Sequence, residues 1–474
     1  MNNAQEAYNF QKDKGFQDLL KQANKCLECG RCSGGCPMAY FFPEHFNPRH
    51  LLERLIENPE DVINSIDIWF CASCYTCNKH CPQGLELPKI LTELRKIAIE
   101  EKGLDQLHEA LKVIQEKIPF AESFFRVCFH PERFPIDKEV IDELIERKTT
   151  DRKVPQLDNR IAIIGSGPAG LYASYLLRLK GFQVSLFEAA DRIGGMFRRC
   201  IPEYRLDDET IDCDVRFIES LGVDIHTNTA IGQDMPFDQL FRDGFEAVFV
   251  ATGAHGSLKM NLDGEDLPEV MGSLHFLEKL KTNNLPVTED RIVVVGGGNT
   301  SIDSAMASIK YGAKEVTVLY RRSKDEMPAD ESEINIAEKE GIQFQYLVSP
   351  IRFIGKEKLE SVEVVKMELG YPDLSGRRRP IQVENSNFLM KADKIVVAIG
   401  DKPMVDFLPK EIQLNGDGTI AVNPINMATN LEGVFAGGDA VLAAGNVSEG
   451  MMTASKAVNG IINYLEKKWT IIRK

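Results

Sequence analysis

The sequence lacks a long hydrophobic run, an excess of positive charge and any low-complexity tract. No stretch of its 474 residues approaches the ~20 uninterrupted apolar residues that cross a bilayer. The most apolar segment, residues 161–177, is broken by three glycines and a proline. Lys and Arg number 56 against 71 Asp and Glu, so the net charge is −15. Because nucleic-acid phosphates are bound by clustered positive charge, we expect neither a nucleic-acid partner nor a membrane span.

The N-terminal residues also lack the basic and apolar segments of a signal peptide. The chain has eleven cysteines, which would be unusual for a disulfide scaffold of this length. We therefore predict a cytoplasmic protein whose thiols stay reduced and available for metals. One basic run, Arg377 to Arg379, lies between Gly376 and Pro380, and we interpret it as an exposed hairpin tip.

Eight cysteines form two groups with the spacing C-x2-C-x2-C-x3-C-P. The groups are Cys26, Cys29, Cys32 and Cys36, and Cys71, Cys74, Cys77 and Cys81. In bacterial ferredoxins with this spacing, the fourth cysteine of each group ligates the other cluster. We therefore predict two [4Fe–4S] clusters. Their ligand sets would be Cys26, Cys29, Cys32 and Cys81, and Cys71, Cys74, Cys77 and Cys36. Zinc sites usually combine two C-x2-C pairs without a final C-P, which disfavours zinc.

The residues around these cysteines have a helical pattern, with helices predicted over 49–58 and within 87–117. In this setting the cysteine motifs resemble those of an iron–sulfur subunit of heterodisulfide reductase, over residues 15 to 130. The resemblance implies an electron-transfer role for this part of the chain. We interpret His80, beside Cys81, as an exposed histidine rather than as part of a cluster environment.

A first dinucleotide-binding motif follows a buried strand predicted over 161–164. The motif G-x-G-x-x-G opens a helix that runs to about residue 180, and the next strand, 184–187, ends at Glu188. In this context the helix N-terminus binds pyrophosphate, and the acid bonds the ribose hydroxyls of an adenosine. We therefore predict an FAD site. Its residues would be Gly165, Gly167, Pro168, Ala169, Gly170 and Glu188.

The same pattern recurs after a strand predicted over 292–295. Its residues are Gly296, Gly298, Asn299 and Thr300, with Ser301 at the third glycine position. Leu319 replaces the ribose-binding acid, and Arg321 and Arg322 follow it. Since arginine pairs with a 2′-phosphate, we predict an NADP(H) site, favoured over NADH. The alternative for Arg321 and Arg322 is a surface pair.

Three further segments are predicted to complete the flavin domain. The strand over 249–254 contains Thr252 and Gly253, where the chain would leave for the nicotinamide domain. A strand over 395–400, ending at Gly400, would bring the chain back. Gly438 and Asp439 follow a buried strand, and we expect Asp439 to bond the ribityl chain. The helix over 446–456 would direct its N-terminus at the flavin and stabilise negative charge there.

Residues 150–474 resemble the small subunit of bacterial glutamate synthase. They equally resemble the FAD- and NADP-binding portions of dihydropyrimidine dehydrogenase and of the bifurcating NADH-dependent ferredoxin:NADP oxidoreductase. The matching segments are Gly165–Gly170, Glu188–Gly195, Ile201–Leu206, Gly296–Asp303, Tyr320–Pro328 and Gly437–Asp439. The second of these adds Arg192, Gly194 and Gly195 to the flavin site. Cys200 stands where the family has glycine, and the regular cysteine spacing also departs from these relatives. Flavin and nicotinamide binding are therefore implied, whereas identity with glutamate synthase is not.

The predicted fold is α/β, with two Rossmann-like, doubly wound nucleotide-binding domains preceded by a mainly helical double-cluster domain. The predicted domains are 1–150 for the clusters, 151–264 and 389–474 for FAD, and 265–388 for NAD(P)H, with a linker over 148–158. We favour ordinary buried thiols for Cys200 and Cys213 over a redox pair, because disulfide reductases use a tighter spacing.

The predicted function is an NADPH-dependent iron–sulfur flavoprotein oxidoreductase. It would move electrons between NAD(P)H, FAD and two [4Fe–4S] clusters, to or from a partner subunit or ferredoxin, in a complex that could be electron-bifurcating. The alternatives are a self-sufficient reductase, resembling a glutamate synthase small subunit or a ferredoxin:NADP reductase, and a redox sensor. No residue is predicted to act as a catalytic acid, base or nucleophile, since the cofactors supply the chemistry. The direction of electron flow stays open.

Overall fold

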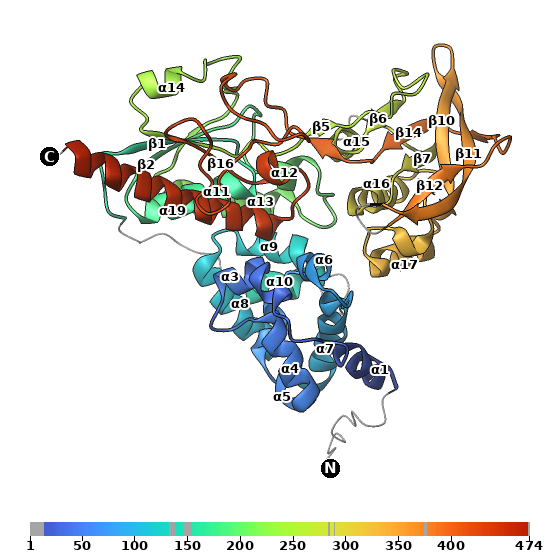
Figure 1. The fold of residues 1–474 in the computed structure, drawn as a ribbon, viewed down its shortest axis with the longest axis horizontal. Helices are drawn as coiled ribbons and strands as arrows, with labels where there is room; N and C mark the ends of the chain where they lie inside the picture. Colours follow the sequence, from blue (N-terminus) through green and yellow to red (C-terminus); the bar gives the residue numbers. More distant parts are fainter. Residues whose placement is uncertain are drawn as a thin grey trace.

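The computed structural model describes residues 14–131, 134, 136, 138–145, 154–282, 285–288, 290–373 and 377–472. Three regions are visible in Figure 1. A helical domain (14–145) lies beneath two α/β domains, each built on a five-stranded parallel sheet. Most of the predicted linker lies outside the described residues, and its end, 154–158, is neither helix nor strand.

The helical domain consists of short helices joined by tight turns. Its elements are α1 (Lys14–Ala23), α2 (Arg31–Gly34), α3 (Pro37–Phe41), α4 (Pro48–Glu57), α5 (Pro59–Ile63), a 3-10 helix (Ile66–Phe70), α6 (Thr76–His80), α7 (Leu87–Lys102), α8 (Asp105–Lys117), α9 (Ala121–Cys128) and α10 (Lys138–Leu144). Proline begins α3, α4 and α5, where its missing N–H costs nothing. The helices predicted over 49–58 and 87–117 are confirmed, the latter as two helices separated at Gly103 (φ +70°).

The first α/β domain contains the sheet β16–β4–β1–β2–β3. Its strands are β1 (Arg160–Ile164), β2 (Gln183–Phe187), β3 (Asp224–His226), β4 (Ala247–Val250) and β16 (Val434–Ala436). Its helices are α11 (Pro168–Leu179), α12 (Met196–Arg199), α13 (Asp208–Ser220), α14 (Gln239–Arg242), α18 (Asp439–Leu442) and α19 (Val447–Ile472). The apolar run of β1 is buried between parallel neighbours, and α19 packs against α11. This is the predicted Rossmann-like arrangement.

The second α/β domain contains the parallel sheet β6–β14–β7–β8–β9. Its strands are β6 (Val270–Gly272), β7 (Arg291–Val295), β8 (Glu315–Tyr320), β9 (Gln343–Tyr346) and β14 (Lys394–Val397), and its helices are α15 (Ser273–Lys281), α16 (Asn299–Lys310) and α17 (Glu331–Lys339). A separate antiparallel sheet of the same domain contains β10 (Val348–Gly355), β11 (Leu359–Pro372), β12 (Arg378–Gln382) and β13 (Phe388–Lys391). They form the long orange ribbons at the right of Figure 1.

The strand predicted over 395–400 exists, but its predicted place in the flavin domain is wrong. β14 lies between β6 and β7 in the second sheet, where Ile395 pairs with Val270 and Val293. The chain returns to the first α/β domain through β15 (Asp401–Lys402), which pairs antiparallel with β5 (Gly256–Ser257). The second domain therefore spans about residues 258–400 rather than 265–388. A short buried apolar strand fits either parallel sheet, so its composition does not reveal its partner.

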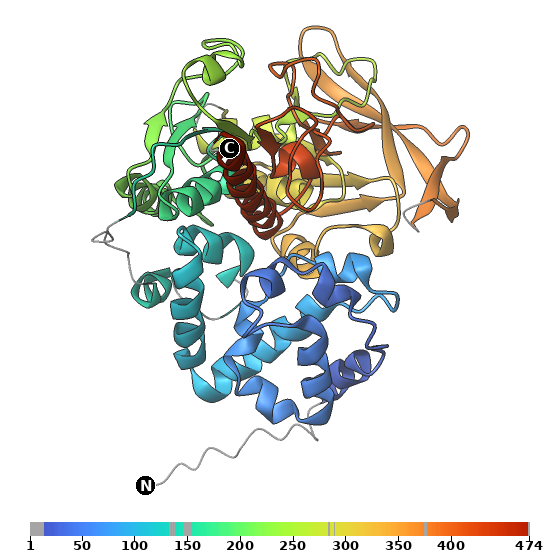
Figure 2. The same cartoon turned by 60° about the vertical axis from the view of Figure 1, so that its left-hand side comes forward.

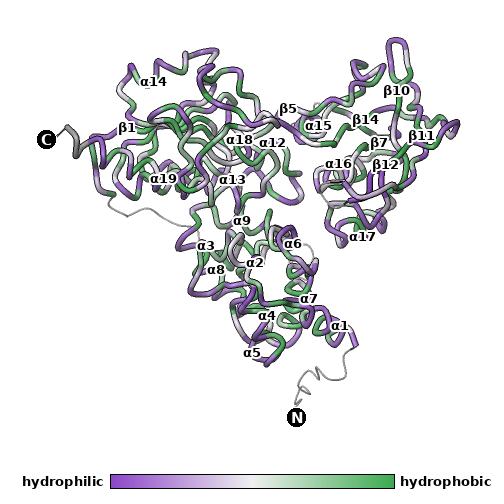
Figure 3. The backbone as a smooth tube through the Cα atoms, viewed as in Figure 1, coloured by the Kyte–Doolittle hydropathy of each residue, from purple (hydrophilic) through white to green (hydrophobic). Residues whose placement is uncertain are grey.

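The hydrophobic core is shared unequally among the three regions. One continuous core joins the helical domain to the first α/β domain, including Phe120, Tyr172 and Ile461. The second α/β domain packs around separate clusters on the two faces of its sheet, with Val294 in one and Val293 in the other. Figure 3 shows green apolar segments concentrated inside each region and purple segments at its outer loops. Among the described residues, no helix combines the length and apolarity that crossing a bilayer requires.

Candidate functional site: a cavity shared by three domains

A cavity of about 2580 Å³ lies where the three regions meet. Both glycine motifs line it, together with the ends of β1, β2, β4, β7 and β8. The helical domain contributes the loop around Cys74. Most of the predicted dinucleotide-binding residues face this cavity: Gly165, Gly167, Pro168, Ala169, Glu188, Arg192, Gly195, Thr252, Gly253, Gly296, Gly298, Asn299, Thr300, Arg321, Arg322, Gly400, Gly438 and Asp439. The remaining two, Gly170 and Gly194, are not among the residues that line it.

The glycines of the first motif are required by close backbone approach. A Cβ at Gly165 (φ +99°) would lie 2.5 Å from the carbonyl oxygen of Ala251, and one at Gly170 would lie 1.9 Å from the carbonyl oxygen of Gly165. Gly170 therefore allows α11 to pack tightly on β1 and does not itself face the ligand. Gly167 is the N-cap of α11, so the free amides of this helix point into the cavity. This cradle fits a pyrophosphate.

Glu188 is held in place at the end of β2. One carboxylate oxygen accepts hydrogen bonds from the amide and hydroxyl of Ser166, and the other accepts from the amide of Ala190 at 2.9 Å. The carboxylate therefore lies beside the glycine motif, as a ribose-binding acid requires. Arg192 lines the same part of the cavity but is ion-paired with Asp208 and Asp212 of α13.

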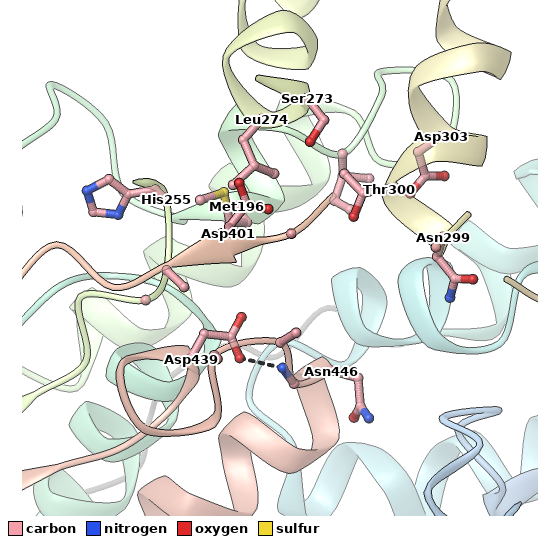
Figure 4. Close-up of a pocket in the computed structure, with 18 of the residues that line it drawn as sticks. Met196, His255, Ser273, Leu274, Asn299, Thr300, Asp303, Asp401, Asp439 and Asn446 are labelled. Atoms are coloured by element: carbon pink, nitrogen blue, oxygen red, sulfur yellow. Dashed lines mark hydrogen bonds between the residues drawn. The ribbon is translucent and has the colours of Figure 1, made fainter. Parts of the chain in front are cut away.

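The opposite wall of the flavin site contains a buried carboxyl group and an unsatisfied hydroxyl group. Asp439 accepts a hydrogen bond from the amide of Gly445 at 2.9 Å (Figure 4), and burial raises the pKa of this carboxyl to about 6. Thr252 Oγ1 is buried and has no hydrogen-bond partner among the described residues. The N-terminal turn of α19, capped by Asn446, also faces the cavity. These groups fit a ligand with several hydroxyls, such as the ribityl chain of a flavin.

The second motif repeats the first with one change. A Cβ at Gly296 would lie 2.2 Å from the carbonyl oxygen of Ala398, so this turn also requires glycine. Ser301, at the third glycine position, is buried and its hydroxyl donates to the carbonyl of Gly298 at 2.6 Å. Asn299 Oδ1 accepts the amide of Asp330 at 3.3 Å, which ties the motif to the start of α17. Asn299 and Thr300 both point into the cavity in Figure 4.

The two predicted phosphate-binding arginines have different surroundings. Arg321 is exposed and lines the cavity. Arg322 is 5% exposed, and its guanidinium donates to Asp373 at 2.8 Å and to the carbonyl of Arg378 at 2.7 Å. Arg377 also lines the cavity, so the basic run interpreted as a hairpin tip contributes to this site. Its contribution depends on the β11–β12 hairpin folding back toward β8, which no local signal reveals.

Five cysteines line a small pocket of the helical domain, and four of them belong to one predicted ligand set. We call Cys26, Cys29, Cys32 and Cys81 the outer cysteine set. Leu27 and Gly30 complete this loop, and the turns at Glu28 (φ +52°) and Gly30 (φ +72°) bend the backbone around the pocket. The amide of Leu85 points at Cys81 Sγ (3.3 Å), as amides do around metal-bound thiolates. Cys29 is exposed.

The other four cysteines, Cys36, Cys71, Cys74 and Cys77, form the inner cysteine set. Burial raises the pKa of the Cys36 thiol to about 12, and the neighbouring Cys74 and Cys71 add to this rise. Burial also raises the pKa of Cys77, with further contributions from Cys71, Cys74 and Cys36. Cys77 also borders the outer pocket, so it lies between the two sets. Buried thiols that repel one another's ionisation are stabilised as thiolates by bound metal.

No three Cys, His, Asp or Glu side chains of the described residues converge on a position for a single metal ion. The remaining cysteines are free thiols: Cys200 is buried, as predicted, whereas Cys213 is only partly buried. Cys200 Sγ contacts Met196 Sδ at 3.3 Å, whereas Cys213 lies beside Arg216. His80 is exposed, which confirms its interpretation.

Two dinucleotide-binding sheets that open on one cavity define a class of flavoprotein, the pyridine-nucleotide-dependent reductases with paired Rossmann-like domains. The comparisons with known proteins agree with this class. A sequence model described as "pyridine nucleotide-disulphide oxidoreductase" matches residues 159–460, and the chain belongs to this family. A second model, "4Fe-4S dicluster domain", matches residues 22–85.

Among curated relatives, the NADP(+)-dependent formate dehydrogenase subunit beta of Moorella thermoacetica is 35% identical. The match covers 83% of this chain and 60% of that protein. The NADPH-Fe(3+) oxidoreductase subunit beta of Geobacter sulfurreducens is 34% identical over 95% of this chain and 72% of its own length. The glutamate synthase [NADPH] small chain of Halomonas elongata is 28% identical over 95% of this chain and 91% of its own length.

A solved structure of Mycobacterium tuberculosis FprA in complex with NADPH superimposes with a TM-score of 0.55 at 19% identity, over 65% of this chain and 85% of FprA. This likeness shows the fold. Together these findings confirm the predicted resemblance to the glutamate synthase small subunit and the predicted class. The chain is an NAD(P)H-dependent FAD and iron–sulfur oxidoreductase.

Proposed function

We propose that this chain transfers electrons between NADPH and a partner subunit, through FAD and two [4Fe–4S] clusters. One observation carries the proposal: Cys74 of the inner cysteine set lines the same cavity as both dinucleotide motifs. When bound, the flavin exchanges electron pairs with a nicotinamide and single electrons with iron–sulfur clusters. The residues of this chain bind and orient these groups.

The helical domain is attached to both dinucleotide sites by residues next to the inner cysteines. Thr76 Oγ1 donates to Glu449 of α19 at 2.9 Å, and the hydroxyl of Tyr75 donates to Asp330 at the start of α17. Lys89 of α7 forms an ion pair with Glu331 at 2.7 Å. These contacts support a short route from the flavin cavity to the inner set.

The outer cysteine set supports an exit at the surface. Cys29 is exposed, and Leu27 beside it is 64% exposed, whereas Cys71 is 7% exposed. We therefore assign the order flavin, inner cluster, outer cluster, partner. The partner is proposed because two of the relatives above are named as beta subunits. The direction of physiological flow depends on the cluster potentials.

Coenzyme choice is assigned to Arg321. Its guanidinium is exposed at the cavity beyond the end of β8, where a 2′-phosphate on the adenosine ribose would lie. Arg322 instead holds the loop through Asp373, so it positions Arg321 and Arg377 rather than binding phosphate itself. The absence of an acid at Leu319 removes the group that would repel this phosphate.

The proposal is tested by separating early from late electron transfer. Anaerobically purified protein should contain about eight irons per chain. Cys29→Ser should leave the reduction of FAD by NADPH unchanged in stopped flow and slow the transfer from the reduced protein to a large acceptor such as ferredoxin. Cys213→Ser is the matched control, because this cysteine belongs to neither set. Undiminished transfer in Cys29→Ser would show that the outer cluster is not the exit, and undiminished transfer in Cys71→Ser as well would make the flavin the exit and favour a self-sufficient reductase.

A further inference from the structure

Arg95 is a fully buried arginine next to the inner cysteine set. It lies on α7 and is 0% exposed. Its Nε and Nη2 donate to the carbonyl of Ile68 at 2.9 and 2.8 Å, and Nη2 also donates to the carbonyl of Cys71 at 2.6 Å. The guanidinium is therefore hydrogen-bonded to the backbone of a predicted cluster ligand.

Aromatic rings enclose the same guanidinium. Its central carbon lies 5.5 Å from the ring centroid of Trp69 and 5.1 Å from that of Phe129. Both rings are buried, at 1% and 2% exposure. Arginine stays protonated in proteins, so its charge persists even in this apolar surrounding. Burying a charge is costly, and an anionic group bound beside Cys71 would offset part of that cost.

We infer that Arg95 raises the reduction potential of the inner cluster and thereby makes it the acceptor of electrons from the flavin. This inference rests on the two clusters proposed above. A [4Fe–4S] cluster with four thiolates is anionic and gains one more negative charge on reduction. A fixed positive charge nearby stabilises the reduced form more than the oxidised form, and low dielectric surroundings strengthen the effect.

The outer cysteine set offers an internal comparison. Arg49 borders its pocket, and Nη1 lies 3.5 Å from the carbonyl of Glu28. The side chain is 44% exposed, however, and forms an ion pair with Glu53 at 3.0 Å. Water and this carboxylate screen its charge. Arg95 is shielded from water and Arg49 is not, so Arg95 has the larger expected effect on its cluster.

The test is a redox titration of the holoprotein followed by electron paramagnetic resonance, in wild type, Arg95→Gln, Arg95→Lys and Arg49→Gln. The signal of the outer cluster is identified by its change in Cys29→Ser. In Arg95→Gln the equilibrium constant for reduction of the inner cluster should fall about tenfold. This lowers its midpoint potential by ~59 mV for one electron. The midpoint of the outer cluster should stay unchanged. Arg95→Lys keeps a charge further from Cys71 and should lie between wild type and Arg95→Gln.

Two results would overturn the inference: an unchanged inner midpoint in a variant that retains about eight irons, or equal shifts of both clusters. If Arg95→Gln does not retain the inner cluster, Arg95→Lys decides, because its inner midpoint must still lie below that of wild type. Arg49→Gln should move the outer midpoint less than Arg95→Gln moves the inner one. About four irons and a single cluster signal in wild type would instead contradict the two-cluster proposal itself.

Discussion

The helical domain contacts the two α/β domains in different ways. Toward the first α/β domain the contact is mainly apolar: Phe41 lies 5.6 Å from Tyr172 between ring centroids, and Phe120 lies 5.9 Å from Phe197. These rings belong to the core that runs through both domains. Toward the second α/β domain the contacts of Tyr75 with Asp330 and of Lys89 with Glu331 are polar, and His130 Nδ1 lies 3.4 Å from Glu333 Oε1. In Figure 2 the blue and cyan helices lie beneath both α/β domains.

This difference indicates which part of the molecule is a rigid unit. Burying apolar surface contributes roughly 25 cal/mol per Å² and resists separation. The exposed ion pair between Lys89 and Glu331 contributes only about 0–1 kcal/mol. The cysteine sets and the flavin site are thus fixed relative to one another, as electron transfer between them requires. The second α/β domain is attached to the helical domain by polar contacts. It is attached to the first α/β domain by the two-stranded β5–β15 connection and by the end of α12, where Cys200 packs into the core cluster of the second domain and Arg199 forms an ion pair with Glu278 at 2.7 Å.

The largest predicted effect comes from disrupting the apolar contact. Phe120 is 0% exposed and lies between Tyr172 and Phe197. Phe120→Ala should destabilise the protein by about 3–5 kcal/mol, measured by urea unfolding. Because the core is continuous, cluster absorbance and flavin fluorescence should change in one transition. Tyr371→Ala, at a side chain that is 90% exposed, is the control and should have almost no effect. Two separate transitions would show that the domains are independent.

The second-largest effect concerns Asp439, which lines the predicted flavin site, and the pH dependence of stability. The folded pKa of Asp439, about 6, is above its ordinary value of 3.8 because of burial. The ionised carboxylate therefore destabilises the folded protein. This destabilisation is absent below about pH 4, grows as pH rises toward 6 and is complete above it. Asp439→Asn should therefore stabilise flavin-free protein by about 3 kcal/mol at pH 8 and leave it unchanged at pH 4. Chemical unfolding at both pH values measures this. Equal stability of both proteins at pH 8 would contradict it.

Coenzyme discrimination tests the second α/β domain by itself. Arg321→Glu should weaken NADPH binding by roughly 1.5–3 kcal/mol, because a charge-assisted hydrogen bond is replaced by repulsion. NADH binding should change little. The dissociation constants of both coenzymes measure the switch. Arg352→Glu, on β10 and paired with Glu363 outside the cavity, is the matched control. A wild type that prefers NADH would show that the predicted coenzyme is wrong.

The smallest effect on stability is expected at the polar contacts. Lys89→Met removes the ion pair with Glu331 and should cost at most about 1 kcal/mol. Hydrogen exchange should nevertheless increase in α17, because the contact holds this helix on the helical domain. Lys96→Met removes a comparable pair with Glu93 within α7 and is the control, without an effect on α17. Unchanged exchange in α17 would indicate that the second domain is as firmly fixed as the first.

Local motifs were the most predictable part of this molecule. Cysteine spacing and glycine turns depend on a few consecutive residues, and the turn at Gly165 requires a positive φ wherever it occurs. The strand–motif–helix units over β1 and β7 are local for the same reason. The position of β14 was not predictable, because its apolar residues suit either parallel sheet. The ion pair between Arg322 and Asp373 was not predictable either, because Asp373 belongs to a hairpin about 50 residues further along the chain.

The sequence by itself therefore determined the chemistry: two cysteine motifs, two dinucleotide motifs and an acid missing from the second. The tertiary structure decided how these parts are connected. It brought Cys74 into the flavin cavity, buried Arg95 beside Cys71 and joined the helical domain to one α/β domain by a core and to the other by polar contacts. Ligand spacing and backbone turns are set by neighbouring residues. Burial and pairing arise between segments far apart in the chain, and no short stretch of sequence records them.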